Sequence, residues 1–187
     1  MTARLFAGLR RLRLALGSAF YRTYLRLAYP GVRCHGSVRF GRGARVRAFA
    51  GGTVELGAGV FVQDYALVLA EGGRLTLGER CEVGRWTVIA AREEIAIGAG
   101  TLIAEHVSIR DADHGTAGEV PLAARPMVTA PVRIGRDVWL GAKVTVTKGV
   151  GIAPFAVVGA NSVVTRSLSE RGTYAGAPAA LLGRRAG

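Results

Sequence analysis

The chain has 187 residues, of which 50% are hydrophobic and 20% charged, and its formal net charge is +12. This length and hydrophobic content suffice for a single globular domain with a sizeable core. No stretch approaches the roughly 18 consecutive apolar residues of a membrane-spanning helix. The two cysteines, Cys34 and Cys81, give no disulfide framework, which fits a reducing compartment.

The positive charge is concentrated at the N-terminus. The 11 Arg residues before Glu55 are accompanied by no Asp or Glu, whereas residues 55–187 carry 14 basic and 13 acidic side chains. In the same region apolar residues recur at helical spacing, at Leu5, Leu9, Leu12, Leu16, Phe20, Tyr24 and Leu27. This spacing predicts a basic amphipathic helix over residues 3–28, ended by Pro30 and Gly31.

Three interpretations of this helix stay open. Its apolar stripe can cover the first coil of the fold that follows, or it can lie on an anionic membrane surface. Nucleic-acid binding rests on charge alone, which is a non-specific feature, so no nucleic-acid partner is expected. A secretory signal is not expected, because the apolar run 14–20 is short, Arg22 follows it, and no small-residue cleavage site is evident. We therefore expect a cytoplasmic protein that can be peripheral at the inner membrane face.

From residue 134 onward an aliphatic residue returns at every sixth position. The series is Ile134, Leu140, Val146, Ile152, Val158 and Val164. A period of six fits neither a helix nor an alternating strand. It fits a chain wound round a triangular prism with one hexapeptide on each face, which is a parallel β-helix.

The same period extends backward through earlier coils. These begin at Leu56, Leu77 and Ile97, and a weaker opening coil contains Phe40 and Val46. The long step from residue 97 to residue 134 predicts a protruding loop at about 110–133. The expected organisation is a basic helix and cap over 1–35, a β-helix over 36–170 and a C-terminal tail over 171–187.

The position of one histidine points to chemistry. His35 lies before the clear repeat and His106 at a side-facing position, whereas His114 stands where the loop leaves the prism, and function concentrates on loops held by a rigid scaffold. A neutral imidazole can take the proton of a hydroxyl or amine that attacks a thioester. Asp111 and Asp113 either orient and charge-stabilise this His or hydrogen-bond loop amides. No His/Cys spacing indicates a metal site.

Several segments share their residues with one family. They are Ile97-Gly98, Asp111-Ala112-Asp113-His114, Pro131 through Ala142, Val158 through Arg166, and Ala175-Gly176-Ala177-Pro178-Ala179. Together they resemble the hexapeptide-repeat acyltransferases, most closely the maltose/galactoside and polysaccharide O-acetyltransferases. The resemblance covers roughly residues 55 to 185.

The resemblance implies an all-β fold, a left-handed parallel β-helix that forms a homotrimer with active sites between neighbouring prisms. It gives His114 the role of general base and acetyl-coenzyme A that of co-substrate, with no metal. The coenzyme-binding positions it implies are Gly141, Ala142, Ala160, Thr165, Arg166 and Arg184. The substrate-binding positions are Arg85, Trp86, Asp111, Asp113 and Trp139. Gly84 stands where related sugar acetyltransferases carry an acceptor-binding Asn, so acceptor recognition is expected to differ from theirs.

The expected function is direct acetyl transfer to a hydroxyl of a small-molecule or lipid-linked sugar, as in glycan or glycolipid synthesis. One alternative on the same scaffold is N-acetylation of an amino sugar or antibiotic. A gamma-type carbonic anhydrase would need a metal held by three His, and the three here are 71 and 8 residues apart. A non-catalytic β-helix used for assembly is the remaining alternative.

Overall fold

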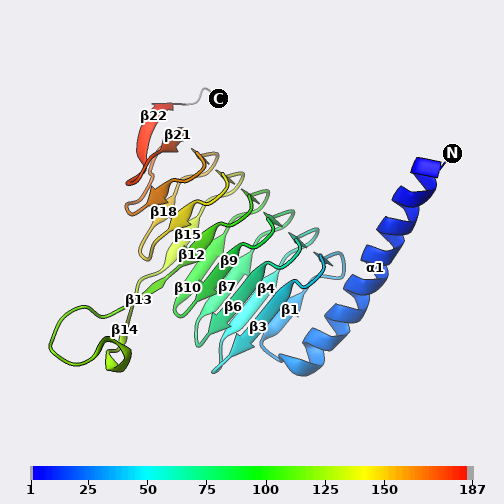
Figure 1. Ribbon diagram of the computed structural model, residues 1–187, viewed down its shortest axis with the longest axis horizontal. Helices are drawn as coiled ribbons and strands as arrows, with labels where there is room; N and C mark the ends of the chain where they lie inside the picture. Colours follow the sequence, from blue (N-terminus) through cyan, green and yellow to red (C-terminus); the bar gives the residue numbers. More distant parts are fainter. Residues whose placement is uncertain (1, 185–187) are drawn as a thin grey trace.

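The computed structural model describes the backbone of residues 2–184 and the side chains of residues 14–184. A helix, α1 (Thr2–Ala28), precedes a solenoid whose strands align in three parallel sheets, the three sides of a prism (Figure 1). The parallel β-helix predicted from the period of six is therefore confirmed.

Each coil contributes one strand to each sheet. Sheet A contains β1 (Val32–Cys34), β4 (Thr53–Leu56), β7 (Arg74–Leu77), β10 (Glu94–Ile97), β15 (Val132–Ile134) and β18 (Gly151–Ile152). Sheet B contains β2 (Arg39–Phe40), β5 (Phe61–Val62), β8 (Glu82–Val83), β11 (Leu102–Ile103), β16 (Trp139–Leu140), β19 (Val157–Val158), β21 (Gly172–Ala175) and β22 (Ala180–Arg184). Sheet C contains β3 (Arg45–Phe49), β6 (Leu67–Glu71), β9 (Val88–Ala91), β12 (Ser108–Arg110), β17 (Thr145–Val146) and β20 (Val163–Val164).

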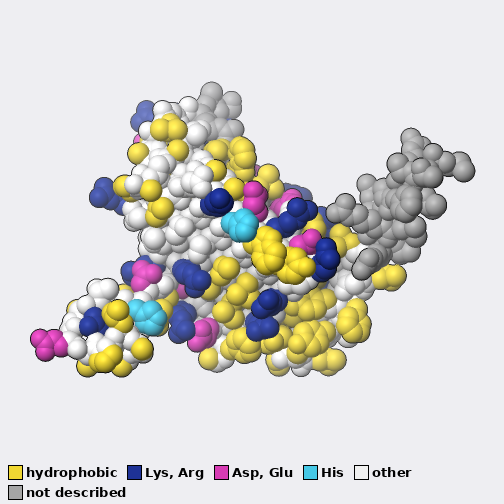
Figure 2. All heavy atoms as spheres, in the orientation of Figure 1, with side chains coloured by type: hydrophobic (Ala, Val, Ile, Leu, Met, Phe, Trp, Pro, Cys, Tyr) yellow, Lys and Arg dark blue, Asp and Glu magenta, His cyan; other side chains and the backbone are white. Residues whose placement is uncertain are grey.

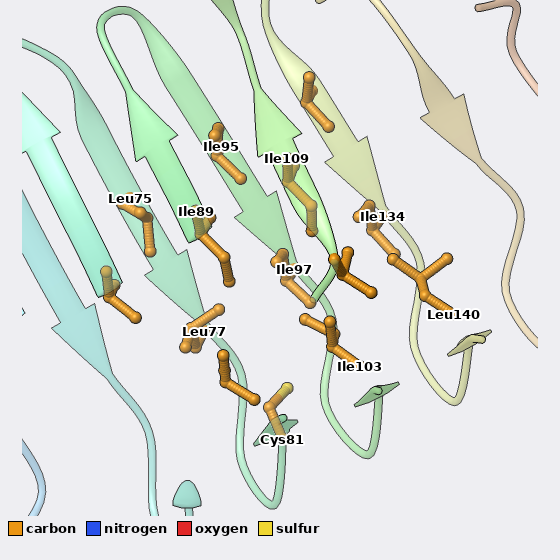
Figure 3. Close-up of a cluster of buried hydrophobic side chains, with 14 of the residues drawn as sticks. Leu75, Leu77, Cys81, Ile89, Ile95, Ile97, Ile103, Ile109, Ile134 and Leu140 are labelled. Carbon is orange, nitrogen blue, oxygen red and sulfur yellow. The ribbon is translucent and has the colours of Figure 1, made fainter. Parts of the chain in front are cut away.

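The hexapeptide aliphatics form the core because the register stacks each one on its counterpart in the next coil. On sheet A, Leu56 pairs with Leu77, then Ile97, Ile134 and Ile152. All of these are buried. Figure 3 shows the interior between the sheets filled by such side chains, and the burial of this apolar surface is the main stabilising term of the fold.

The edges of the prism turn through residues with left-handed backbone. We name each edge by the sheets it joins: A–B, B–C and C–A. On the B–C edge five non-glycine residues have φ between 57° and 60°, namely Tyr65, Trp86, His106, Lys143 and Asn161. Each costs about 1–2 kcal/mol for an L-residue. The backbone N–H of each of these five residues donates a hydrogen bond to a carbonyl of the preceding coil, at 2.9–3.2 Å.

Helix α1 caps the open first coil, but not with the stripe that the sequence indicated. Leu25 is buried against the coil, whereas Leu16, Phe20, Tyr24 and Leu27 are exposed. The stripe positions Leu5, Leu9 and Leu12 lie outside the residues whose side chains are described. The interpretation of a cap that packs through its apolar stripe is thus wrong about the face of the helix.

The predicted loop leaves the prism between β12 and β15, on the C–A edge. It contains an antiparallel pair, β13 (Ala112–His114) with β14 (Met127–Thr129), and a short 3-10 helix, η1 (Leu122–Ala124). Figure 1 shows it standing off the body. At the far end β22 turns back antiparallel to β21. Among the described residues, no helix has the length and apolar character needed to cross a membrane.

Candidate active site

The β13–β14 ribbon carries His114 away from the prism. His114 pairs through its backbone with Met127, and its side chain is exposed. Among the side chains described for residues 14–184, none forms a hydrogen bond with the His114 imidazole. A solvent-accessible imidazole without a partner can accept a proton from a bound substrate.

Asp111, three residues before His114, points the other way. It is completely buried, and its two carboxylate oxygens accept hydrogen bonds from the backbone amides of Arg92 and Glu93, both at 2.8 Å. Of the two roles the sequence left open, Asp111 therefore takes amide binding, and its carboxylate is not offered to a substrate. Side chains alternate along a strand, so an inward Ile109 and an outward Arg110 already place residue 111 inward. The sequence analysis missed this signal.

Asp113 is exposed at the base of the ribbon. Its Oδ2 accepts a hydrogen bond from Nζ of Lys148 at 2.7 Å. Lys148 lies on the C–A edge one coil further along, and sequence reasoning did not single it out. The period of six would have located it, because residues 147–148 occupy the same corner position as residues 110–111.

The same edge carries two of the predicted coenzyme-binding residues. Thr165 and Arg166 follow β20 directly and are both exposed. Since β12, β17 and β20 are successive strands of sheet C, the order along this edge is His114, Lys148 and then Arg166. A basic side chain thus lies on each of the two coils below the His114 ribbon.

Three other predicted coenzyme-binding positions, Gly141, Ala142 and Ala160, lie on the B–C edge. A groove of about 320 Å³ is lined there by Trp139, Gly141, Ala142 and Ala160. Trp139 is half exposed on sheet B, between Leu102 and Val157 of the neighbouring strands. Small residues at the edge leave the backbone accessible to a narrow ligand. A larger hollow of about 600 Å³ along sheet A is lined by no carboxylate or imidazole, so we place the chemistry elsewhere.

Arg85 and Trp86, the predicted acceptor residues, lie on the B–C edge two coils before Ala142. The indole of Trp86 stacks on the Tyr65 ring, with centroids 4.3 Å apart, and lies parallel to the His106 ring at 6.5 Å. Arg85 and Trp86 are both exposed. The aromatic stack was not foreseen, although Tyr65, Trp86 and His106 occupy the same position in successive coils.

Arg184 lies on β22, which extends sheet B beyond the last coil. Its Nε donates a hydrogen bond to Oε2 of Glu170 at 2.6 Å, and this contact raises the pKa of Arg184. Arg184 therefore stays charged at the C-terminal end of the prism. Arg185 lies outside the described residues.

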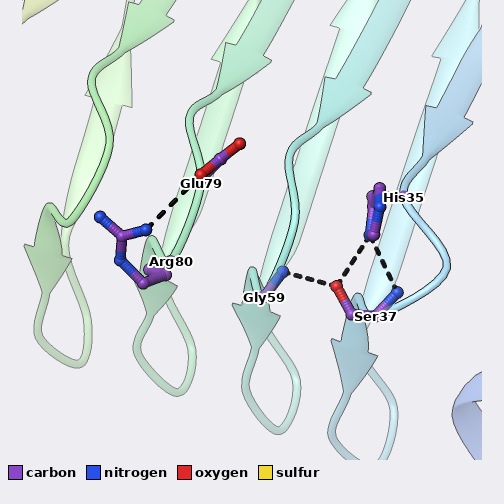
Figure 4. A network of polar contacts seen from close by, with 5 residues as sticks. All are labelled: His35, Ser37, Gly59, Glu79 and Arg80. Carbon is purple, nitrogen blue, oxygen red and sulfur yellow. Dashed lines mark hydrogen bonds and ion pairs between the residues drawn. The ribbon is translucent and has the colours of Figure 1, made fainter.

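The remaining histidine and the cysteines support the fold. His35 and Ser37 form a hydrogen-bonded pair on the A–B edge, and Ser37 accepts the amide of Gly59 (Figure 4). Burial raises the pKa of both Cys34 and Cys81 to about 11, so neither is a thiolate at neutral pH. The three His thus lie on three different edges, and in the described part of the chain no three His, Cys, Asp or Glu side chains are grouped to hold a metal ion.

Most of the predicted residues form two groups separated by sheet C, whereas the buried Asp111 and Arg184 on β22 belong to neither. The first, the C–A half-site, consists of His114, Asp113, Thr165 and Arg166. The second, the B–C half-site, consists of Arg85, Trp86, Trp139, Gly141, Ala142 and Ala160. One prism does not bring them together, because its edges are held apart by the stacked strands between them.

Comparison with known proteins places the chain in a family, although no family model matches it. It is 32% identical over 162 residues to Rv3034c of Mycobacterium tuberculosis, provisionally named an acetyltransferase, covering 86% of this chain and 54% of that protein. It is 34% identical over 182 residues to WbbJ of Escherichia coli K12, provisionally named a lipopolysaccharide biosynthesis O-acetyl transferase, covering 89% of this chain and 82% of WbbJ. The chain thus spans about half of the first relative and most of the second.

The fold has solved counterparts. AntD, an N-acyltransferase from Bacillus cereus crystallised with dTDP-4-amino-4,6-dideoxyglucose and coenzyme A, superposes with a TM-score of 0.72 at 19% identity, over 89% of this chain and 90% of AntD. The fold is accordingly the left-handed parallel β-helix that the resemblance implied. Its fold and its 34% sequence identity to WbbJ show that the chain belongs to the hexapeptide-repeat acetyltransferases.

Proposed function

We propose that the protein transfers an acetyl group from acetyl-coenzyme A to a hydroxyl of a sugar, in a site formed between two copies of the chain. The observation that carries this proposal is the separation of the two half-sites. The general base lies on the C–A edge and the narrow groove on the B–C edge. They can meet only if the C–A edge of one prism faces the B–C edge of its neighbour. Repetition of this contact closes a ring, and we propose a homotrimer.

His114 is the general base in this proposal. Its imidazole takes the proton of the acceptor hydroxyl while that oxygen forms a bond to the thioester carbonyl carbon. The carbon–sulfur bond then breaks, and the imidazolium returns the proton to the departing sulfur. Such proton transfer contributes typically ~10²–10⁴-fold to a rate. No covalent enzyme intermediate is required.

The B–C groove suits acetyl-coenzyme A, which supplies the activated acetyl group when bound. Ala142 and Ala160 let its narrow arm approach the backbone, and an amide near Ala142 can stabilise the negative charge that develops on the thioester oxygen. Thr165 and Arg166 of a neighbouring copy would contact the phosphate end, where Arg184 adds positive charge.

The acceptor would lie on the opposite side of His114, towards Arg85 and Trp86. An exposed indole edge and a guanidinium suit a sugar that carries hydroxyls or an anionic group. WbbJ supports a glycan hydroxyl. AntD, with its amino-sugar nucleotide, makes N-acetylation of an amino sugar the second candidate. Coenzyme A release measured with matched hydroxyl and amino sugars separates the two.

Mixing of damaged protomers tests the shared site. His114→Ala removes the C–A half-site, and Ala160→Trp fills the B–C groove at an exposed position. Each variant alone should be inactive. Co-expressed in equal amounts, they should recover about a quarter of wild-type activity, because about a quarter of the interfaces join two intact half-sites. The readout is coenzyme A release from purified mixed oligomers.

Two variants damaged on the same edge provide the control. A mixture of His114→Ala with Arg166→Glu leaves no interface with an intact C–A half-site, so no activity should return. Absence of recovery in the first mixture would show that the half-sites do not act across an interface.

A further inference from the structure

Helix α1 has two opposite faces, and only one is used by the prism. On the inner face Ser18 Oγ accepts the amide of Phe40 at 2.9 Å and Arg22 donates to the carbonyl of Val38 at 2.7 Å. Leu25 is 1% exposed there. These contacts satisfy backbone groups that the open first coil would otherwise leave unpaired.

The outer face is apolar and uncovered. Leu16, Phe20, Tyr24 and Leu27 are 63%, 78%, 46% and 80% exposed. At 100° per residue they fall within an arc of about 80°, opposite Leu25 and Ser18. Large apolar side chains grouped in this way mark an interaction surface, whereas single exposed ones do not.

Five arginines lie on the first coil, which the inner face of α1 covers. The first coil carries Arg33 on sheet A, Arg39 on sheet B, and Arg45 and Arg47 on sheet C, and Arg42 lies on the B–C edge. We call these five residues the arginine rim. None of the ion pairs found among the described side chains involves a rim residue. Figure 2 shows Lys and Arg side chains along the coils next to the helix.

We propose that the outer face of α1 and the arginine rim together dock the protein on an anionic lipid bilayer. Leu16, Phe20 and Leu27 would enter the boundary between headgroups and acyl chains, and the rim would contact lipid phosphates. A nucleic acid would use the positive charge but leave the apolar side chains without a partner. A second copy would bring two arginine rims together, and their repulsion disfavours that contact.

The docked orientation follows from the helix position. Figure 1 shows α1 crossing the N-terminal end of the prism. The coils would then rise from the membrane at ~4.8 Å each, so that the His114 level lies roughly 15 Å above the first coil. In a ring of parallel prisms every helix faces the same surface, which multiplies the apparent affinity. If the proposed acetyl transfer holds, this height suits a sugar attached to a lipid.

Sedimentation of the full chain with vesicles tests the docking. Wild-type protein should pellet with phosphatidylcholine vesicles that contain phosphatidylglycerol, much less with phosphatidylcholine alone, and less as salt rises. Phe20→Ser combined with Leu27→Ser should lower the partition coefficient about 100-fold, about 10-fold for each side chain withheld from the bilayer. Acetyl transfer to a soluble acceptor should stay unchanged, so that loss of docking and loss of catalysis are distinguished.

Two further variants make the result specific. Val120→Ser with Leu122→Ser removes similar exposed apolar side chains from the protruding loop and should leave pelleting unchanged. Arg33→Gln with Arg45→Gln keeps the apolar face and should weaken binding about fivefold per charge, only with anionic vesicles.

The proposal is overturned by any of three results. If wild-type protein does not pellet with anionic vesicles, or if the Phe20 and Leu27 double variant pellets as wild type does, α1 does not dock on lipid. If that variant instead changes the oligomeric mass in sedimentation velocity while vesicle binding persists, the outer face is a contact between copies.

Discussion

Two passages of the chain across the C–A edge differ by one insertion. From β9 to β10 the edge is turned by Arg92 and Glu93 alone, whereas from β12 to β15 the chain runs through residues 111–131. The two passages are in contact, because the first residue of the long one, Asp111, binds both amides of the short turn. The residue that supports the turn, Asp111, is directed inward. The exposed imidazole, His114, stands only three positions later and is directed outward.

This comparison shows how a repeat accommodates a functional insertion. The short turn needs acceptors for its amides, and the long passage supplies them before it leaves the prism. The ribbon then starts from a fixed point, since Asp111 is held inside the coil and β13 pairs with β14. A proton-accepting side chain on a protruding loop needs a rigidly anchored backbone, and this contact provides it.

The largest expected effect comes from removing the reactive end of the long passage. His114→Ala should lower kcat by about 10²–10⁴-fold, because no general base then takes the proton of the sugar hydroxyl. Coenzyme binding should persist, since the B–C groove is untouched. Steady-state coenzyme A release and calorimetric titration with coenzyme A measure the two quantities.

His35→Ala is the matched control, because it removes an imidazole from the A–B edge, remote from both half-sites. It should leave kcat near the wild-type value. Equal losses in the two variants would show that His114 acts through folding and not as a base.

The regular coils could be predicted from the sequence, because one geometric rule governs them. Leu56, Leu77, Ile97, Ile134 and Ile152 recur in phase, and the structure stacks them in one column. The break at residue 110 was also visible, as an interruption of that phase. The edges followed less readily, since which side chains meet on an edge depends on counting corner positions across coils of unequal length.

The packing of α1 could not be predicted from periodicity. An apolar stripe indicates which side of a helix avoids water, but the open coil presents an unpaired amide at Phe40 and a carbonyl at Val38, which require polar partners. Ser18 and Arg22 provide them. Hydrogen-bond demand, which hydrophobic patterning does not record, therefore selects the inner face.

An intermediate effect, on stability, is expected at the buried carboxylate of Asp111. Asp111→Asn keeps the shape but replaces one acceptor with a donor that faces the amide of Arg92 or Glu93. Leaving a buried group unpaired costs roughly 1–3 kcal/mol, so the free energy of unfolding should fall by about 2 kcal/mol. Urea denaturation measures this change.

Asp113→Asn, on the exposed part of the ribbon, is the control for that loss. A half-exposed ion pair contributes typically 0–1 kcal/mol, so its stability should stay close to wild type. If Asp111→Asn were as stable as Asp113→Asn, the short turn would not depend on the long passage.

The smallest expected effect concerns the ion pair between Asp113 and Lys148, which joins the ribbon to the next coil at 2.7 Å. Both side chains are partly exposed, so Lys148→Gln should lower kcat by no more than about fivefold, the rate equivalent of roughly 1 kcal/mol. High salt should lower the wild-type rate towards that of the variant, because salt screens the pair.

The combination of Lys148→Gln with Asp113→Asn completes a double-mutant cycle. If the ribbon is positioned through this contact, the double variant loses no more than either single one; additive losses would mean that the base of the ribbon alone, anchored by Asp111, sets where His114 stands.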